Sequence, residues 1–131
     1  NVGSEKEVNL VNTLLKTDAL ASKYSLLLFY QSGCEPCEAA IEGLKNNYTI
    51  LKEKGIRIIA LSADIDPQVF KDNAAAFPWK DTYCNLEGLN GVNFKSYAVT
   101  GTPTMFVLDS KGILLKKIAT IKQLLTWSEK L

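Results

Sequence analysis

The chain has 131 residues, of which 47% are hydrophobic, and its 15 basic residues nearly balance its 14 acidic ones. This length predicts one domain over residues 1–131, and the balanced charge argues against nucleic-acid binding. The longest apolar stretch, residues 26–30, is too short to cross a bilayer, and the sequence contains no histidine, which excludes histidine metal ligands and Cys-His or Ser-His nucleophiles.

The first predicted elements are a helix, a buried strand and a second helix. A capping box followed by apolar residues at helical spacing predicts a helix over residues 5–20. Residues 25–31 (SLLLFYQ) form a compact apolar run that is typical of a central strand buried on both faces. Apolar residues then recur with a period near 3.6 from Pro36 onward, which predicts one helix ended by Gly55.

The rest of the chain predicts a sheet with interleaved helices. Residues 56–62 (IRIIALS) indicate a second buried strand, and residues 66–76 a short helix. Residues 80–93 carry glycines and little periodicity, which indicates a loop. The remaining predicted elements are a helix at 93–98, strands at 104–108 and 113–118 joined by a hairpin turn at 109–112, and a helix at 122–130. This order predicts an α/β fold with a central mixed four-stranded sheet flanked by helices on both faces.

The chemistry of the sequence is concentrated at Cys34 and Cys37, which flank Glu35 and Pro36 between the first predicted strand and the helix after it. A helix N-terminus stabilises a thiolate, so Cys34 is the expected attacking thiol. The spacing lets Cys37 resolve the mixed disulfide that Cys34 forms. Pro36 stiffens the intervening turn, and the charge of Glu35 opposes thiolate formation, which favours a reducing pair.

Two other roles of a Cys-x-x-Cys pair, a zinc site and a structural disulfide, have less support in this sequence. A structural zinc site lacks its second half, because Cys84 stands alone and histidine is absent, so no metal site is expected. A purely structural disulfide between Cys34 and Cys37 closes a very small loop and gains little stability from it.

A second motif, VTGTPT at residues 99–104, places Pro103 just before the third strand, where a proline suits a turn. With the CEPC motif and the DSKG hairpin, it resembles the thioredoxin superfamily, and within it the TlpA/ResA-like extracytoplasmic thiol-disulfide oxidoreductases. The FPW segment at 77–79 and the TPTMFVLD segment at 102–109 support this placement. The resemblance implies that Pro103 is a cis-proline facing the disulfide and that the backbone of Thr102 pairs with an extended substrate segment.

The resemblance also implies a function. It is the reduction of protein disulfides through Cys34 and Cys37, with disulfide-containing substrate proteins and an upstream thiol donor as partners, and with no cofactor beyond the cysteine pair. It further implies a monomer in the periplasm or cell envelope, with membrane contact only through an anchor outside this sequence.

The sequence departs from the family pattern at three positions. Gly33 stands where thioredoxins keep a tryptophan, Leu28 replaces their buried acid, and Ala40 stands where some relatives keep a glutamate. No internal carboxylate is therefore evident for the proton of Cys37, although water or Glu38 could serve. The N-terminal β-hairpin common in that group is also absent, and the chain is expected to be the thioredoxin-like part of a larger polypeptide.

Two alternative functions are weighed. A thiol peroxidase of the peroxiredoxin type needs Thr or Ser three residues before the attacking cysteine and an arginine, but Gln31 occupies that position and Arg57 is the only arginine. A non-catalytic thioredoxin-like interaction module does not need an intact cysteine pair.

The remaining candidates receive structural interpretations first. Cys84 is expected to be a small buried hydrophobe, with a thiol near the active site as the alternative. Phe77 and Trp79 are expected to cover the core, with an apolar substrate lip as the alternative. Asp64 and Asp66 are expected to be loop and cap residues rather than a cation site.

Overall fold

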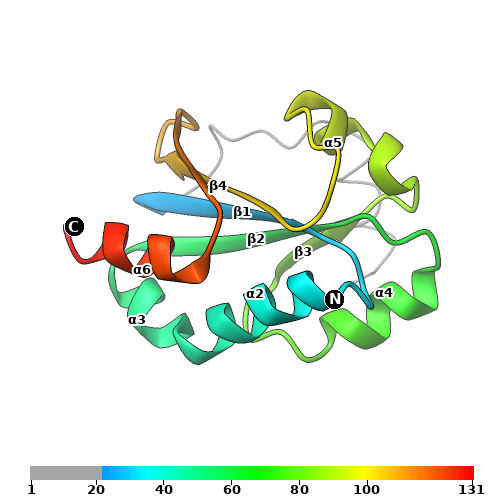
Figure 1. Ribbon diagram of the computed structural model, residues 1–131, viewed down its shortest axis with the longest axis horizontal. Coiled ribbons are helices and arrows are strands. Elements are labelled where there is room, and N and C mark those ends of the chain that lie inside the picture. The colour runs from blue at the N-terminus through cyan, green and yellow to red at the C-terminus, as the bar shows by residue number, and fades with distance from the viewer. Residues whose placement is uncertain (1–21) are drawn as a thin grey trace.

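The computed structural model describes residues 22–131, so the helix predicted over residues 5–20 lies outside the described part. The strands form a single sheet, and helices lie between most of them along the chain (Figure 1). In order they are β1 (Tyr24–Tyr30), α2 (Glu35–Asn46), α3 (Tyr48–Glu53), β2 (Ile56–Ser62), α4 (Pro67–Ala74), β3 (Asp81–Cys84), the 3-10 helix η2 (Gly88–Asn90), α5 (Val92–Ser96), β4 (Thr104–Asp109), β5 (Leu114–Ile118) and α6 (Ile121–Ser128).

The sheet has five strands in the order β3-β2-β1-β4-β5, and β1 is its central strand. Strands β2 and β3 run parallel to β1, whereas β4 is antiparallel to it. Phe29 near the end of β1 pairs with Thr104, the first residue of β4. The turn that follows β1 and the segment that precedes β4 therefore lie side by side at the C-terminal end of β1.

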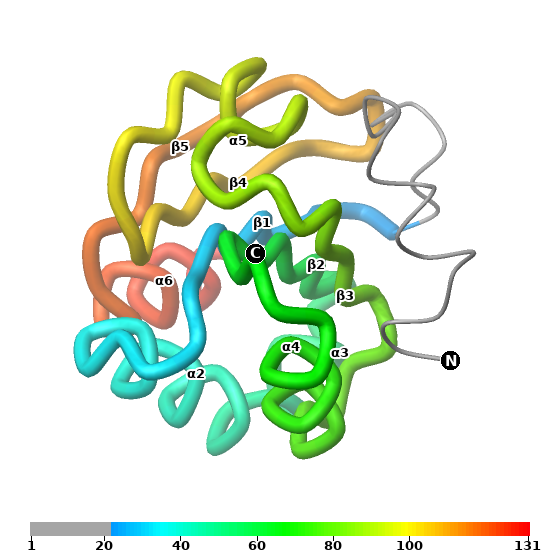
Figure 2. Tube along the Cα trace, turned by 90° about the vertical axis from the view of Figure 1, so that its right-hand side faces the viewer, coloured from blue at the N-terminus to red at the C-terminus, as the bar shows by residue number. Residues whose placement is uncertain are grey.

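Both faces of the sheet are covered, as the apolar run in β1 predicts. Leu26, Leu28 and Tyr30 pack with α2, α3 and α6, while Leu27 and Phe29 pack with α5 on the other face. Figure 2 shows α5 on the opposite side of the sheet from α2, α3 and α4. Among the helices of residues 22–131, none has the length and apolar character that a membrane span requires.

The prediction of four strands is wrong, because part of the predicted loop over residues 80–93 is the edge strand β3. Thr82 and Cys84 point inward and are buried, so the strand alternates over four residues only. The Arg57 guanidinium fixes its start by donating two hydrogen bonds to Asp81, from Nε at 2.8 Å and from Nη2 at 2.7 Å. A strand of four residues is too short to show a clear alternation in the sequence. The ion pair that holds it joins residues that are 24 positions apart, so it leaves no local pattern.

The prediction of one helix from Pro36 to Gly55 is also wrong, because the helix breaks at Asn47. The side-chain amide of Asn47 donates to the Gly43 carbonyl at 2.8 Å, and its backbone leaves the helical region with φ −114° and ψ 12°. Asparagine competes for helical backbone groups in this way, which ends α2 and starts α3.

The other described helices and strands agree with their predictions within a few residues at each end, except that the 3-10 helix η2 lies in the predicted loop. Asp66 caps α4 by accepting the N–H groups of Gln68 and Val69. The hairpin turn after β4 forms as predicted, since the Gly112 N–H donates to the Asp109 carbonyl at 3.0 Å.

Candidate active site

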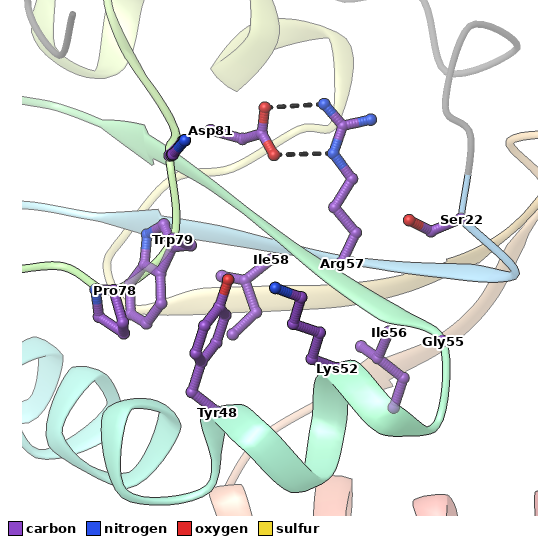
Figure 3. A pocket seen from close by; sticks show the side chains of 11 residues that line it. Ser22, Tyr48, Lys52, Gly55, Ile56, Arg57, Ile58, Pro78, Trp79 and Asp81 are labelled. Carbon is purple, nitrogen blue, oxygen red and sulfur yellow. Dashed lines mark hydrogen bonds and ion pairs between the residues drawn. The ribbon is translucent and has the colours of Figure 1, made fainter.

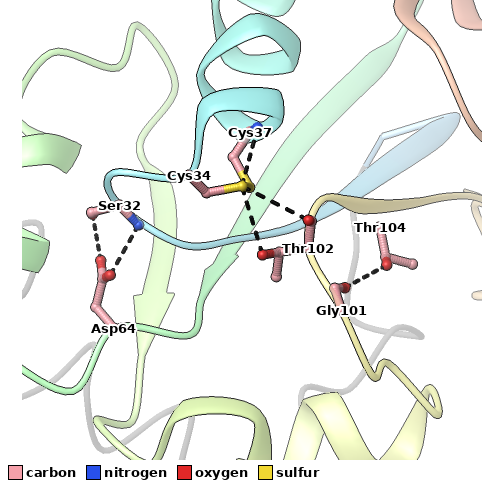
Figure 4. Close-up of a disulfide and its surroundings, with 7 residues drawn as sticks. All are labelled: Ser32, Cys34, Cys37, Asp64, Gly101, Thr102 and Thr104. Atoms are coloured by element: carbon pink, nitrogen blue, oxygen red, sulfur yellow. Dashed lines mark hydrogen bonds between the residues drawn. A yellow bond between two sulfur atoms is a disulfide. The ribbon is translucent and has the colours of Figure 1, made fainter.

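Cys34 is the N-cap of helix α2, and its sulfur is part of the capping interaction. Its backbone is extended, with φ −85° and ψ 114°, and its Sγ accepts a hydrogen bond from the Cys37 N–H at 3.3 Å. The two cysteines form a disulfide (Figure 4), in which Cys34 is half-buried and Cys37 is buried. The expected placement of Cys34 at a helix N-terminus is therefore found in the structure.

The residues between the cysteines shape the electrostatics of this helix end. Glu35 begins α2 and Pro36 follows it, so the proline occupies a position where its missing N–H leaves no helical partner unsatisfied. Glu35 and Glu38 both lie in the first turn and are exposed. Their charges oppose a thiolate on Cys34 while the helix N-terminus favours it.

Thr102, which directly precedes Pro103 in the chain, lies against the disulfide from the other side (Figure 4). The peptide bond between them is cis, as the resemblance implies. Cys34 Sγ lies 3.8 Å from the Thr102 carbonyl oxygen and 3.9 Å from the Thr102 hydroxyl oxygen. In the dithiol state the thiol can donate to that carbonyl, and the hydroxyl can donate to a thiolate.

The buried carboxylate of Asp64, which the sequence predicts only as a loop residue, contacts the turn between β1 and α2. Asp64 is 5% exposed and accepts hydrogen bonds from the backbone N–H of Ser32 at 3.0 Å and from its hydroxyl at 2.6 Å. The signal was in the strand register, because β1 pairs Tyr30 with Ser62 and the same offset brings Ser32 beside Asp64. The interpretation of Asp64 as a loop residue was incomplete.

The other candidates are structural. Cys84 is fully buried, its thiol donates to the Asp64 carbonyl oxygen at 3.2 Å, and burial raises its pKa. Trp79 is buried in the main core, and the ring of half-buried Phe77 lies 4.8 Å from it, centroid to centroid. Both aromatic side chains thus cover the core, as the first interpretation expects.

Arg57 lies far from the cysteine pair along the sheet. It pairs with Ser25 near the start of β1, whereas the disulfide follows the end of that strand. It borders a cavity of about 420 Å³ together with Tyr48, Lys52 and Trp79 (Figure 3). The arginine that a peroxidase site needs is therefore committed to Asp81 elsewhere, which argues against the peroxidase alternative.

No cluster of three or more potential metal ligands is found among residues 22–131. Two of the three residues that depart from the family pattern are apolar and buried: Leu28 in the core and Ala40 on α2. A Cβ added to Gly33 would meet no atom within 4 Å, but its φ of +78° disfavours other residues.

Comparison with known proteins agrees with this architecture. Residues 22–114 match the family model described as Thioredoxin-like, and the chain belongs to this family. Over 92 residues it is 33% identical to the thiol-disulfide oxidoreductase ResA of Bacillus thuringiensis, which covers 70% of this chain and 52% of ResA. Over 112 residues it is 27% identical to mouse nucleoredoxin, which covers 84% of this chain and 26% of nucleoredoxin.

A solved structure supports the same relationship. The C-terminal domain of a putative thiol-disulfide oxidoreductase from Bacteroides thetaiotaomicron superposes with a TM-score of 0.73 and 26% identity, over 87% of this chain and 82% of that one. The chain spans about half the length of the ResA proteins that it matches.

Proposed function

We propose that this chain is a thiol-disulfide oxidoreductase that reduces protein disulfides through Cys34 and Cys37. The observation that carries the proposal is the position of Cys34 Sγ, which caps α2 and accepts the Cys37 N–H at 3.3 Å. This donor and the helix N-terminus favour the thiolate, which is the nucleophile in disulfide exchange. The similarity to ResA supports the same reaction class.

The reaction proceeds in two exchanges. The Cys34 thiolate attacks one sulfur of the substrate disulfide, forming a mixed disulfide and releasing one substrate thiolate. The Cys37 thiolate then attacks Cys34 Sγ, which closes the internal disulfide and releases the second substrate thiolate. Two electrons pass from the dithiol to the substrate, whose thiolates take up two protons, and an upstream thiol donor regenerates the dithiol.

The substrate segment is expected to bind beside the cis peptide bond. The backbone of Thr102 lies next to Cys34 Sγ and can pair with an extended chain, which gives recognition that is largely independent of sequence. A hollow of about 380 Å³ on the neighbouring surface is lined by Pro36, Ala40, Pro103 and Ile121 among others. It offers space for an apolar side chain near the substrate cysteine.

The physiological setting follows from the resemblance. We place the protein outside the cytoplasm, in the periplasm or cell envelope, as a monomer that receives electrons from an upstream thiol donor. The charge of exposed Glu35 beside the sulfur supports a reducing role, because it disfavours the thiolate of the dithiol state.

Insulin reduction with dithiothreitol tests the activity. Wild type should accelerate insulin precipitation, and Cys34→Ser should abolish the acceleration. Cys84→Ser should leave it intact as the matched control, because a serine hydroxyl can still donate to the Asp64 carbonyl oxygen that the Cys84 thiol contacts. Equal rates for wild type and Cys34→Ser would refute the proposal. Rapid peroxide consumption by the dithiol would favour the peroxidase alternative instead.

A further inference from the structure

We propose that Asp64 is a positioning residue, which holds Cys34 at the tip of α2 through a two-bond clamp on Ser32. The inference rests on the proposed function, since it concerns how that thiol is kept reactive. Asp64 lies just after β2, whereas Ser32 lies two residues before Cys34 in the turn after β1. The clamp therefore joins the active-site turn to a neighbouring strand, as Figure 4 shows.

The clamp uses both polar hydrogens of Ser32. Its backbone N–H donates to one carboxylate oxygen of Asp64 at 3.0 Å, and its hydroxyl donates to the other at 2.6 Å. Hydrogen bonds to a charged acceptor are about twice as strong as neutral ones. Because Asp64 is 5% exposed, water competes little for these oxygens.

Asp64 is itself held at its backbone. Its N–H donates to the Ser62 hydroxyl at 2.9 Å, and its carbonyl accepts the Cys84 thiol at 3.2 Å. Ser62 and Cys84 are paired residues of β2 and β3, and both are buried. The third cysteine thus contributes to the active site by anchoring the residue that clamps the turn.

The turn between Ser32 and Cys34 gives the clamp its importance. Gly33 has φ +78° and no Cβ, so the chain at this point is permissive. Cys34 can cap α2 only while the turn presents its sulfur to the Cys37 N–H. Fixing Ser32 on the strand side limits the directions in which the turn can move the sulfur.

Geometry and charge of Asp64 act in opposite directions on the Cys34 thiol. A displaced turn weakens the capping bond and disfavours the thiolate, whereas removal of a nearby negative charge favours it. The exposed carboxylates Glu35 and Glu38 face the same helix end and are unchanged in every variant below.

Three substitutions separate these effects. Asp64→Ala removes the clamp and the charge, and Ser32→Ala removes the stronger clamp bond but keeps the charge. Asp64→Asn removes the charge but can keep both bonds, because its oxygen accepts the Ser32 N–H and its amide donates to the Ser32 hydroxyl. Asp66→Ala is the control, since it removes an α4 cap from the same loop without touching Ser32.

The readouts are kcat/KM for insulin reduction and the pH dependence of Cys34 alkylation in the reduced protein, followed on the Cys34 peptide by mass spectrometry. Ser32→Ala should lower kcat/KM about fivefold and raise the Cys34 pKa, as expected for loss of a cap-type interaction. Asp64→Ala should lower kcat/KM at least as much, while Asp64→Asn should stay within about twofold of wild type.

Several results would overturn the inference. One is a Ser32→Ala variant with the kcat/KM and the Cys34 alkylation profile of wild type. Another is a loss of kcat/KM in Asp66→Ala as large as that in Ser32→Ala. The third is a loss of kcat/KM in Asp64→Asn as large as that in Asp64→Ala. If Asp64→Ala does not fold by circular dichroism, Ser32→Ala alone decides. An inactive wild type would refute the proposed function, but the alkylation profiles would still test the clamp.

Discussion

The backbone N–H of Cys37 donates a hydrogen bond to Cys34 Sγ at 3.3 Å, so the proposed nucleophile is also the cap of the helix that carries its partner. A donor that faces a charged sulfur contributes more than one that faces a neutral thiol. The interaction therefore favours the thiolate without any cationic side chain. It belongs to the backbone, so it persists when the side chain of Cys37 is replaced.

Cys37→Ala should consequently keep a reactive Cys34 but trap it on its substrates. The variant retains the Cys37 N–H and loses only the resolving thiol. Mixed disulfides should accumulate and be visible on non-reducing gels, and dithiothreitol should release them. Cys34→Ala is the control, and mixed disulfides formed at an equal level on that variant would contradict the assigned order of attack.

Glu35→Gln should make the pair more oxidising. Loss of the negative charge beside Cys34 stabilises its thiolate and with it the dithiol state. The equilibrium with reduced and oxidised glutathione should move several-fold toward the dithiol. Glu42→Gln, two turns further along α2, is the matched control and should leave the equilibrium unchanged.

Burial of three acidic groups should make the protein less stable in alkali. Burial raises the pKa values of Cys84, Tyr30 and Tyr97 above their ordinary values of 9.0 for the thiol and 10.0 for the phenols. The unfolded chain therefore loses these protons first, and the unfolding free energy should fall as pH rises above 9.0. Below that pH the contribution is fully present.

Urea titrations of the disulfide form between pH 7 and 11 would check this expectation. The Cys84→Ala variant should lose the part of the decline that begins near pH 9, while the part that begins near pH 10 should remain with Tyr30 and Tyr97. A flat profile for wild type across this range would show that the three groups ionise alike in both states.

The ion pair between Arg57 and Asp81 should hold the edge strand β3 in place. Both side chains are about three-quarters buried, at 28% and 26% exposed, and their contact is bidentate. Asp81→Asn should lower the unfolding free energy by about 1 kcal/mol in a salt-dependent way. Glu42→Gln breaks an exposed pair at 3.9 Å with Lys45 and should have a much smaller effect in the same urea titration.

How much of the fold the sequence predicts depends on the range of the interactions involved. The compact apolar run of β1 and the CEPC turn after it are local signals, and the structure follows them closely. β3 was missed because its four residues are held by β2 and by Arg57, which lies 24 residues earlier. The break at Asn47 was missed because the apolar period continues across it.

The candidate site divides in the same way. The position of Cys34 at a helix N-terminus can be predicted from its neighbours in the chain. The expectation that Thr102 and Pro103 lie beside the cysteine pair came from the family resemblance. The contact of Asp64 with Ser32 spans 32 residues and requires the parallel register of β1 and β2. Only a sequence argument that fixed this register could have found the carboxylate.

The positive φ of Gly33 has a consequence for protein engineering. A Cβ added there would meet no atom within 4 Å, so the first side-chain atom of a tryptophan like that of thioredoxins meets no obstacle. The obstacle is the main chain, because a left-handed conformation costs a residue with a side chain about 1–2 kcal/mol. Grafting that aromatic residue onto this scaffold thus calls for a redesigned loop rather than one exchange of side chains.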